Sequence, residues 1–144
     1  EVQYQFYNEE IALAEAMGVG IQPFKKEVFY QRTSVLGEEY MGEGCNVPFE
    51  EQWEVGFATG PFTIKNRYVT EDVPVGCHVY HELGKKFGVP TPIIDSMIVL
   101  GGVMNKTNFF ETGLTLEELG IGHMTKEQMQ AYLREGEYVA PEGE

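Results

Sequence analysis

A short segment of almost unbroken apolar residues, 93–104, constrains the fold of this chain more than any other feature. Its apolar side chains fall on nearly every side of a helix: Ile93, Ile94, Met97, Ile98, Val99, Leu100, Val103 and Met104. A helix that is hydrophobic all round is either central to a core or spans a membrane. This one is far shorter than the roughly 20 residues that cross a bilayer. The segment therefore predicts the central helix of a soluble helical domain.

The start of this helix is marked by polar residues. Thr91 is a natural N-cap, with Pro92 at the first helical position, and Asp95 falls in the first turn, where negative charge is favoured. Thr91 and Asp95 would also stand at a helix N-terminus that could face a substrate pocket. They are therefore candidate substrate-binding residues, with ordinary capping as the alternative. The pair Gly101-Gly102 predicts a close approach by a neighbouring segment.

A second helix is predicted immediately upstream. One of its faces is apolar at helical spacing, through Val75, Val79, Leu83 and Phe87, with Tyr80 beside them. Pro74 fits a first turn, Lys85 and Lys86 suit the last turn, and Gly88 can take a left-handed exit conformation. The two helices should form a buried hairpin.

A cluster of charged residues stands at the entrance to this hairpin. Arg67, Glu71 and Asp72 directly precede Val73-Pro74. In one interpretation Asp72 is an ordinary N-cap, worth on the order of 1 kcal/mol, and Arg67 is its ion-pair neighbour. In the other, the arginine and the aspartate are functional groups. Glu71 is interpreted as a solvated first-turn acid.

The rest of the chain predicts further helices. The predicted helices lie at 2–17, 24–36, 49–57, 116–120 and 126–135, with an irregular glycine-rich stretch at 37–48 and an extended one at 62–69. Thr115 with Glu118, and Thr125 with Gln128, match the capping-box pattern. The predicted fold class is all-α, a single irregular helical domain over 1–144 with about six to seven helices around one core.

Composition narrows the possible partners. Ten basic and 23 acidic residues give a net charge of −13, which disfavours nucleic acid and anionic membrane surfaces. Cys45 and Cys77 show no framework spacing, so free thiols and a cytoplasmic location are expected. Cys77, His78 and His81 could suggest a metal site, but too few further ligands are available, and no metal site is predicted. No signal peptide or membrane span is predicted.

Three short motifs together carry a family resemblance. They read Arg67-Tyr-x-x-Glu-Asp72-Val-Pro-x-Gly, then Leu83-Gly, then Gly88-Val-Pro-Thr-Pro-x-Ile-Asp95. In this order they resemble the C-terminal helical domain of the NAD/NADP-dependent octopine/nopaline (opine) dehydrogenase family. The opening Asn8-Glu-Glu-Ile-Ala-Leu-Ala-Glu-Ala-Met-Gly18 fits the same order more loosely. The resemblance implies a fold like that of the 6-phosphogluconate dehydrogenase C-terminal domain.

The resemblance also implies a reaction. Members of this family condense an amino acid with an α-keto acid and reduce the imine with NADH or NADPH, using an N-terminal Rossmann domain and a histidine upstream of the helical domain. This chain contains no G-x-G-x-x-G motif and begins without methionine, so it is expected to be a fragment lacking that domain. By the family pattern Asp72 orients the histidine, and Arg67 anchors a substrate carboxylate or pairs with the aspartate. NAD or NADP would be bound mainly by the missing domain, and no cofactor-binding residue is predicted here.

The expected function is therefore that of a substrate-binding domain whose isolated form is inactive. Expected partners are an amino acid, an α-keto acid and the Rossmann domain in cis; a second copy in a homodimer is left open. Two alternatives stay open: a free-standing helical protein-interaction domain, and the helical domain of another Rossmann-type dehydrogenase acting on 2-hydroxy acids.

Overall fold

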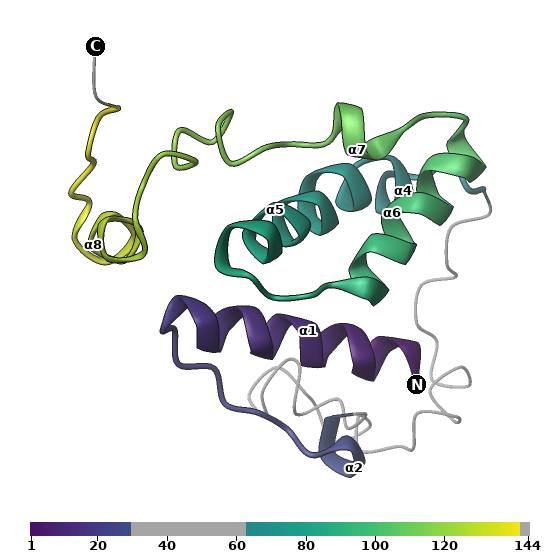
Figure 1. The fold of residues 1–144 in the computed structure, drawn as a ribbon. Coiled ribbons are helices and arrows are strands. Elements are labelled where there is room, and N and C mark those ends of the chain that lie inside the picture. The colour runs from purple at the N-terminus through teal and green to yellow at the C-terminus, as the bar shows by residue number, and fades with distance from the viewer. Residues whose placement is uncertain (30–62, 142–144) are drawn as a thin grey trace, which may run out of the picture. The chain divides into compact units, whose positions relative to one another are not determined.

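The computed structural model describes residues 1–29 and 63–141. Within these ranges the ordered structure is helical and contains no strand, which confirms the all-α prediction. The helices are α1 (Val2–Met17), α2 (Lys26–Phe29), α4 (Arg67–Thr70), the π-helix η4 (Val73–Cys77), α5 (His78–Phe87), α6 (Pro92–Asn105), α7 (Phe109–Thr112) and α8 (Lys126–Glu135) (Figure 1).

The chain divides into two compact units. The smaller unit comprises Glu1 and Gln22–Phe62, of which Glu1 and residues 22–29 are described; there the ammonium of Lys26 pairs with the Glu1 carboxylate. The larger unit comprises Val2–Ile21 and Thr63–Glu144. The larger unit contains every residue that the sequence marks as a candidate for catalysis or substrate binding.

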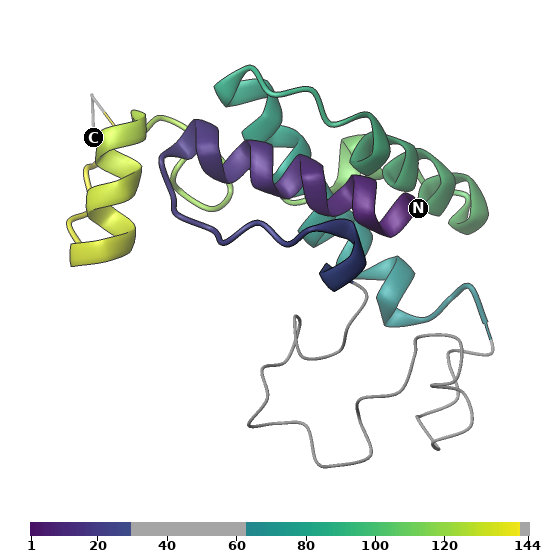
Figure 2. The same cartoon turned by 90° about the horizontal axis from the view of Figure 1, so that it is seen from below.

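Helices α5 and α6 form the predicted hairpin. Gly88 ends α5 in the left-handed conformation, with φ of 70°, and its N–H donates to the carbonyl of Gly84. Helix α1 packs against both helices of the hairpin (Figure 1, Figure 2). No helix in the described part of the chain is both long enough and apolar enough to cross a membrane.

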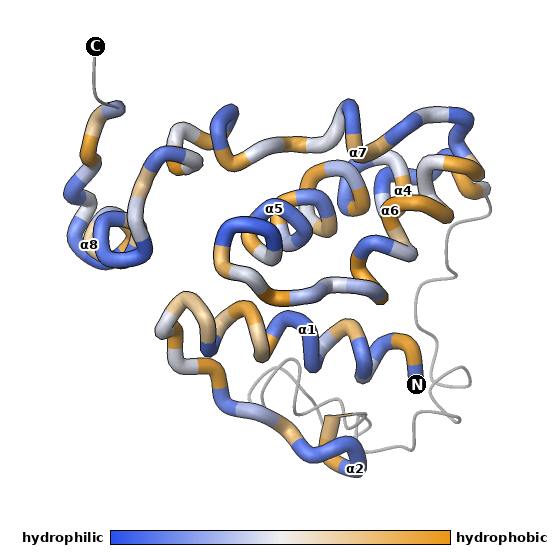
Figure 3. Tube along the Cα trace, viewed as in Figure 1, coloured by the Kyte–Doolittle hydropathy of each residue, from blue (hydrophilic) through white to orange (hydrophobic). Residues whose placement is uncertain are grey.

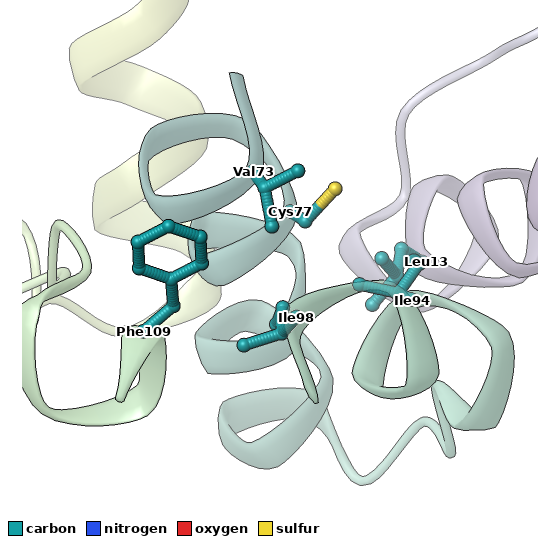
Figure 4. Close-up of a cluster of buried hydrophobic side chains, with 6 residues drawn as sticks. All are labelled: Leu13, Val73, Cys77, Ile94, Ile98 and Phe109. Atoms are coloured by element: carbon teal, nitrogen blue, oxygen red, sulfur yellow. The ribbon is translucent and has the colours of Figure 1, made fainter. Parts of the chain in front are cut away.

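The core lies where α1, η4, α6 and α7 meet. Its buried side chains are Leu13, Val73, Cys77, Ile94, Ile98 and Phe109 (Figure 4). Ile94 and Ile98 are fully buried, so α6 supplies the centre of the core as expected. Hydrophobic positions recur along the length of α6 (Figure 3). Yet Leu100 and Val103 are 60% and 72% exposed, so in this unit only one side of the apolar helix is covered.

The glycine pair in α6 allows the predicted close approach. A Cβ added to Gly101 would lie 3.2 Å from Cγ1 of Val73, and one added to Gly102 would lie 2.5 Å from the carbonyl oxygen of Thr107. The second distance is below any ordinary contact, and the obstructing atom belongs to the backbone. Gly102 is therefore required for the turn after α6 to fold back.

Several predicted helices are confirmed and others are not. The predictions at 2–17 and 126–135 match α1 and α8, and α2 covers part of the helix predicted at 24–36. The predictions at 37–48 and 49–57 lie outside the described residues. Residues 116–120 form turns instead of a helix, although the Thr115–Glu118 pair predicted there is present, with the Glu118 N–H donating to the threonine hydroxyl at 3.1 Å.

Two short helices were not predicted. Helix α4 occupies part of the stretch predicted to be extended, and α7 follows α6. Each is started by an asparagine: Oδ1 of Asn66 accepts from the Tyr68 N–H, and Oδ1 of Asn108 accepts from the Phe110 N–H, both at 3.2 Å. Asparagine is a strong N-cap, but a helix of a single turn has no apolar periodicity to reveal it.

Candidate functional site

Arg67 and Asp72 lie near the junction between two short helices. Arg67 is the first residue of α4, and Asp72 is the residue before η4. Both side chains are exposed. The Asp72 carboxylate makes no capping hydrogen bond, and none of the ion pairs of the described residues involves Asp72 or Arg67. The interpretation of this pair as a simple cap and its ion-pair neighbour is therefore wrong.

The Arg67 guanidinium instead lies over an aromatic ring, 5.8 Å from the ring centroid of Tyr68. An exposed contact of this kind contributes about 0.5–1 kcal/mol and leaves the N–H groups of the guanidinium free to donate. Arg67 and Asp72 thus place an exposed cation and an exposed anion only five residues apart in sequence.

The segment that follows Asp72 is a π-helix and not the regular α-helix that the spacing predicted. Val73, Pro74 and Cys77 of η4 are buried, and the His78 N–H donates to the carbonyl of Val73. The loop after α7 holds this turn in place, because the N–H of Leu114 donates to the Pro74 carbonyl at 2.9 Å. Single π-turns occur frequently at functional sites. Asp72 is therefore attached to a buried and well-supported turn.

A polar cluster lies close to Asp72: it consists of the buried Cys77 and the partly buried Glu10 and Tyr80. Burial raises the pKa of Glu10, while a hydrogen bond with Tyr80 lowers it. Burial, followed by the charge of Glu10 and a hydrogen bond to it, raises the pKa of Tyr80 to about 12. Burial, then the charges of Glu10 and Asp72, raise the pKa of Cys77 to about 11. Cys77 is a free cysteine, and this environment keeps its thiol protonated and unreactive.

The two predicted substrate-binding residues lie together at the start of α6. The Thr91 hydroxyl donates to Oδ1 of Asp95 at 3.0 Å, and Nδ1 of His81 lies 2.8 Å from the same oxygen. Thr91 is buried, whereas the Asp95 side chain is 38% exposed. This network links α5 to the first turn of α6. His81, considered in the sequence only as a metal ligand, is its third member.

The N-terminus of α6 is capped by a residue from α1. Oε1 of Glu9 accepts from the Ile93 N–H at 2.8 Å, and Oε2 accepts from the Ile94 N–H at 3.0 Å. Thr91 occupies the cap position but makes no capping hydrogen bond, because its hydroxyl is turned to Asp95. A carboxylate at a helix N-terminus is stabilised by both the free amides and the helix dipole.

His78 has a structural partner of its own. Its ring is buried, and Nδ1 lies 2.9 Å from the carbonyl oxygen of Leu114. The ring packs so closely on Gly113 that a Cβ there would overlap Cγ of the histidine. No group of three potential metal ligands occurs among the residues that the structure describes.

Sequence reasoning missed Glu9, Glu10 and His81 as site residues. Glu9 and Glu10 belong to the segment from Asn8 to Gly18 that takes part in the family resemblance. That resemblance was the only signal in the sequence that could have marked them as site residues. The contact of Glu9 with Ile93 spans 84 positions, and no local pattern indicates it.

Comparison with known proteins gives two findings. Residues 1–105 match the family model described as NAD/NADP octopine/nopaline dehydrogenase, alpha-helical domain. The chain is also 33% identical, over 120 residues, to an opine dehydrogenase of Arthrobacter sp. (strain 1C). That alignment covers 81% of this chain and 31% of the relative, so the chain spans about a third of the length of the curated relative it matches.

Proposed function

The chain belongs to the NAD/NADP octopine/nopaline dehydrogenase family through its alpha-helical domain, and from this premise we propose that it is the substrate-binding part of a longer enzyme. That enzyme reductively condenses an amino acid with an α-keto acid. Residues 1–144 act as one helical domain, and a Rossmann domain of the same polypeptide binds NAD or NADP. The similarity to a relative about three times as long supports the proposal.

The exposed pair Arg67 and Asp72 carries the chemistry in this proposal. The supporting observation is that Asp72 is held on a buried π-turn, yet its carboxylate has neither a cap nor an ion pair among the described residues. A free carboxylate can accept the N–H of an imidazole, fix its tautomer and stabilise the imidazolium form. The proposed partner is an acid–base histidine in the Rossmann part of the enzyme.

Arg67 has the chemistry to bind the substrate. A guanidinium can donate two parallel hydrogen bonds to a carboxylate, and both proposed substrates carry one. The Tyr68 ring supports the guanidinium without using its donors. Arg67 therefore anchors a substrate carboxylate in this proposal, and Asp72 orients the proton carrier.

Thr91 and Asp95 have a less direct role in the proposal. The Thr91 hydroxyl is already committed to Asp95, so the group that could contact a substrate is the half-exposed Asp95 carboxylate. Its free oxygen could accept the amine of an amino acid. The cytoplasmic location and the possible homodimer are also parts of this proposal, the former supported by the free Cys77 thiol.

The test measures NADH and NADPH oxidation by absorbance, with mixtures of amino acids and α-keto acids. The full-length polypeptide should turn over, and the 144-residue chain should not, because its partner groups are absent. Replacing Arg67 with Ala in the full-length enzyme should raise KM for the substrate whose carboxylate it binds. Turnover by the 144-residue chain alone would contradict the proposal, and so would an unchanged KM in the Arg67→Ala variant.

A further inference from the structure

A cavity lies at the far end of the hairpin, where α8 meets the last turns of α1 and α5. Its volume is about 180 Å³. The apolar part of its wall consists of Met17, Val19, Phe87, Met129 and Leu133. Phe87 stands fifteen residues after Asp72, which at 1.5 Å per helical residue is about 20 Å away. The cavity is therefore separate from the candidate site.

The end of α1 explains how α8 is held there. Gly18 ends α1 with φ of 69°, and the amide group of Gln130 in α8 donates to the carbonyl of Met17. A Cβ on Gly18 would lie 2.7 Å from Nε2 of Gln130 and 3.2 Å from Cε of Lys126. The absence of a side chain at Gly18 thus lets α8 approach. The Thr125–Gln128 capping box fixes the start of α8 beside this contact.

Two cations complete the cavity wall. Lys126 and Arg134 both line it, and none of the ion pairs of the described residues involves either. The Lys126 ammonium lies by the C-terminus of α1, where the negative end of the helix dipole partly balances its charge. Arg134 lies in the last turn of α8, where its exposed guanidinium keeps its donors available at the rim of the cavity.

We propose that this cavity binds a small carboxylate with a compact apolar body, of the size of benzoate or hexanoate. The apolar body fills the hollow, and the carboxylate accepts from the Arg134 guanidinium in bidentate fashion. The size is appropriate, since an apolar cavity of about 150 Å³ holds benzene. Helix α8 lies beyond residue 105, where the family match ends, so this site is additional to the proposed reaction.

The test titrates benzoate, hexanoate and the neutral analogue benzyl alcohol into the 144-residue chain, followed by NMR shifts of the Met17, Met129 and Leu133 methyl groups. Both acids should saturate those shifts, and benzyl alcohol should bind at least tenfold more weakly. Failure of either acid to saturate them at millimolar concentration would overturn the proposal. Equal affinity for benzyl alcohol would overturn the assignment of an anionic ligand.

Two variants sharpen the test. Arg134→Gln should weaken benzoate binding about tenfold and leave benzyl alcohol unaffected. The matched control is Lys85→Gln, which removes one positive charge from α5 at a position paired with Glu82 and outside the cavity. If both variants weaken benzoate equally, the attraction is general and the proposal fails. Thermal melts of both variants establish that each remains folded.

Benzoate binding should also be independent of the candidate site. Asp72→Asn should leave the benzoate affinity unchanged, because the carboxylate lies at the opposite end of the hairpin. A loss of benzoate binding in that variant would show that the acid binds at the candidate site and would overturn the separate cavity site. A negative result in this experiment leaves the proposed dehydrogenase activity intact, since activity is measured by NAD(P)H oxidation.

Discussion

One aspartate lies near the start of each helical arm of the hairpin, and the surroundings of the two carboxylates differ. Asp72 precedes η4 with an exposed carboxylate that caps nothing. Asp95, in the first turn of α6, accepts from Thr91 and contacts His81. In sequence both look like helix-start acids. In the structure they differ: the Asp95 carboxylate links α5 to α6 through His81 and Thr91, whereas the Asp72 carboxylate has no capping hydrogen bond and no ion pair among the described residues.

The largest expected effect is on catalysis at Asp72. In the proposed full-length enzyme, Asp72→Asn should lower kcat by up to roughly 10²–10⁴-fold, the range that an acid–base group contributes, because the proposed acid–base histidine would lose the carboxylate that orients it. The unfolding free energy should change by less than about 0.5 kcal/mol, since the side chain is exposed and makes no cap. Steady-state kinetics and urea melts measure the two quantities. Glu71→Gln, at the adjacent exposed acid, is the control and should retain activity.

At Asp95 we expect the larger effect on the free energy of unfolding and not on catalysis. Asp95→Ala removes the acceptor of the buried Thr91 hydroxyl and the partner of His81, which should cost about 1–3 kcal/mol of stability. Urea denaturation of the 144-residue chain measures it. Asp95→Asn keeps an acceptor and should cost less. If Asp95→Ala is as stable as the parent chain, the contrast between the two aspartates is lost.

A substitution at Glu9 tests whether the stability of the first turn of α6 depends on its cap from α1. Glu9→Ala leaves the N–H groups of Ile93 and Ile94 without their acceptor, which should cost about 1–2 kcal/mol, as loss of a helix cap does. Amide hydrogen exchange should accelerate most in the first turn of α6. The control is Glu15→Ala, an exposed glutamate on the same helix, which should have little effect.

A smaller effect is expected on the Cys77 thiol. The charge of Asp72 is one cause of its raised pKa of about 11, against an ordinary 9.0. Asp72→Asn should therefore lower that pKa slightly and speed alkylation at alkaline pH, whereas Asp95→Asn should not. Equal alkylation rates in the two variants would show that Asp72 does not act on the thiol.

The stability of the fold at alkaline pH depends on Cys77 and Tyr80. The folded state holds the protons of Cys77 and Tyr80 more tightly than the unfolded chain, whose ordinary pKa values are 9.0 and 10.0. Their contribution is therefore complete below about pH 9 and is lost as the pH rises through about 11 and 12. Tyr80→Phe should flatten this loss in urea melts recorded across that range.

The sequence was sufficient for features that depend on neighbouring residues. The periodicity of α5, the left-handed exit at Gly88 and the capping box at Thr125 were all predicted and are present. These signals lie within one or two helical turns, where spacing and side-chain chemistry decide the outcome. The pairing of Thr91 with Asp95 is similarly local, although its role as a network instead of a cap was not predicted.

Features that depend on distant contacts were not predictable. The π-turn of η4 is held by Leu114, and the α6 cap comes from Glu9. Neither contact leaves a local pattern, because each joins segments that meet only after the chain has folded. The lack of a partner for the Asp72 carboxylate was not predictable for the same reason. It depends on which side chains of the described segments come near Asp72 once the chain has folded.

The origin of the α6 cap in α1 also has a consequence during synthesis. The ribosome must add 84 further residues after Glu9 before Ile93 exists, which takes roughly 4–17 s at 5–20 residues per second. Throughout that interval the first helix lacks the amides that it will later bind. A nascent chain halted before residue 93 should therefore expose Leu13 to any chaperone at the tunnel exit.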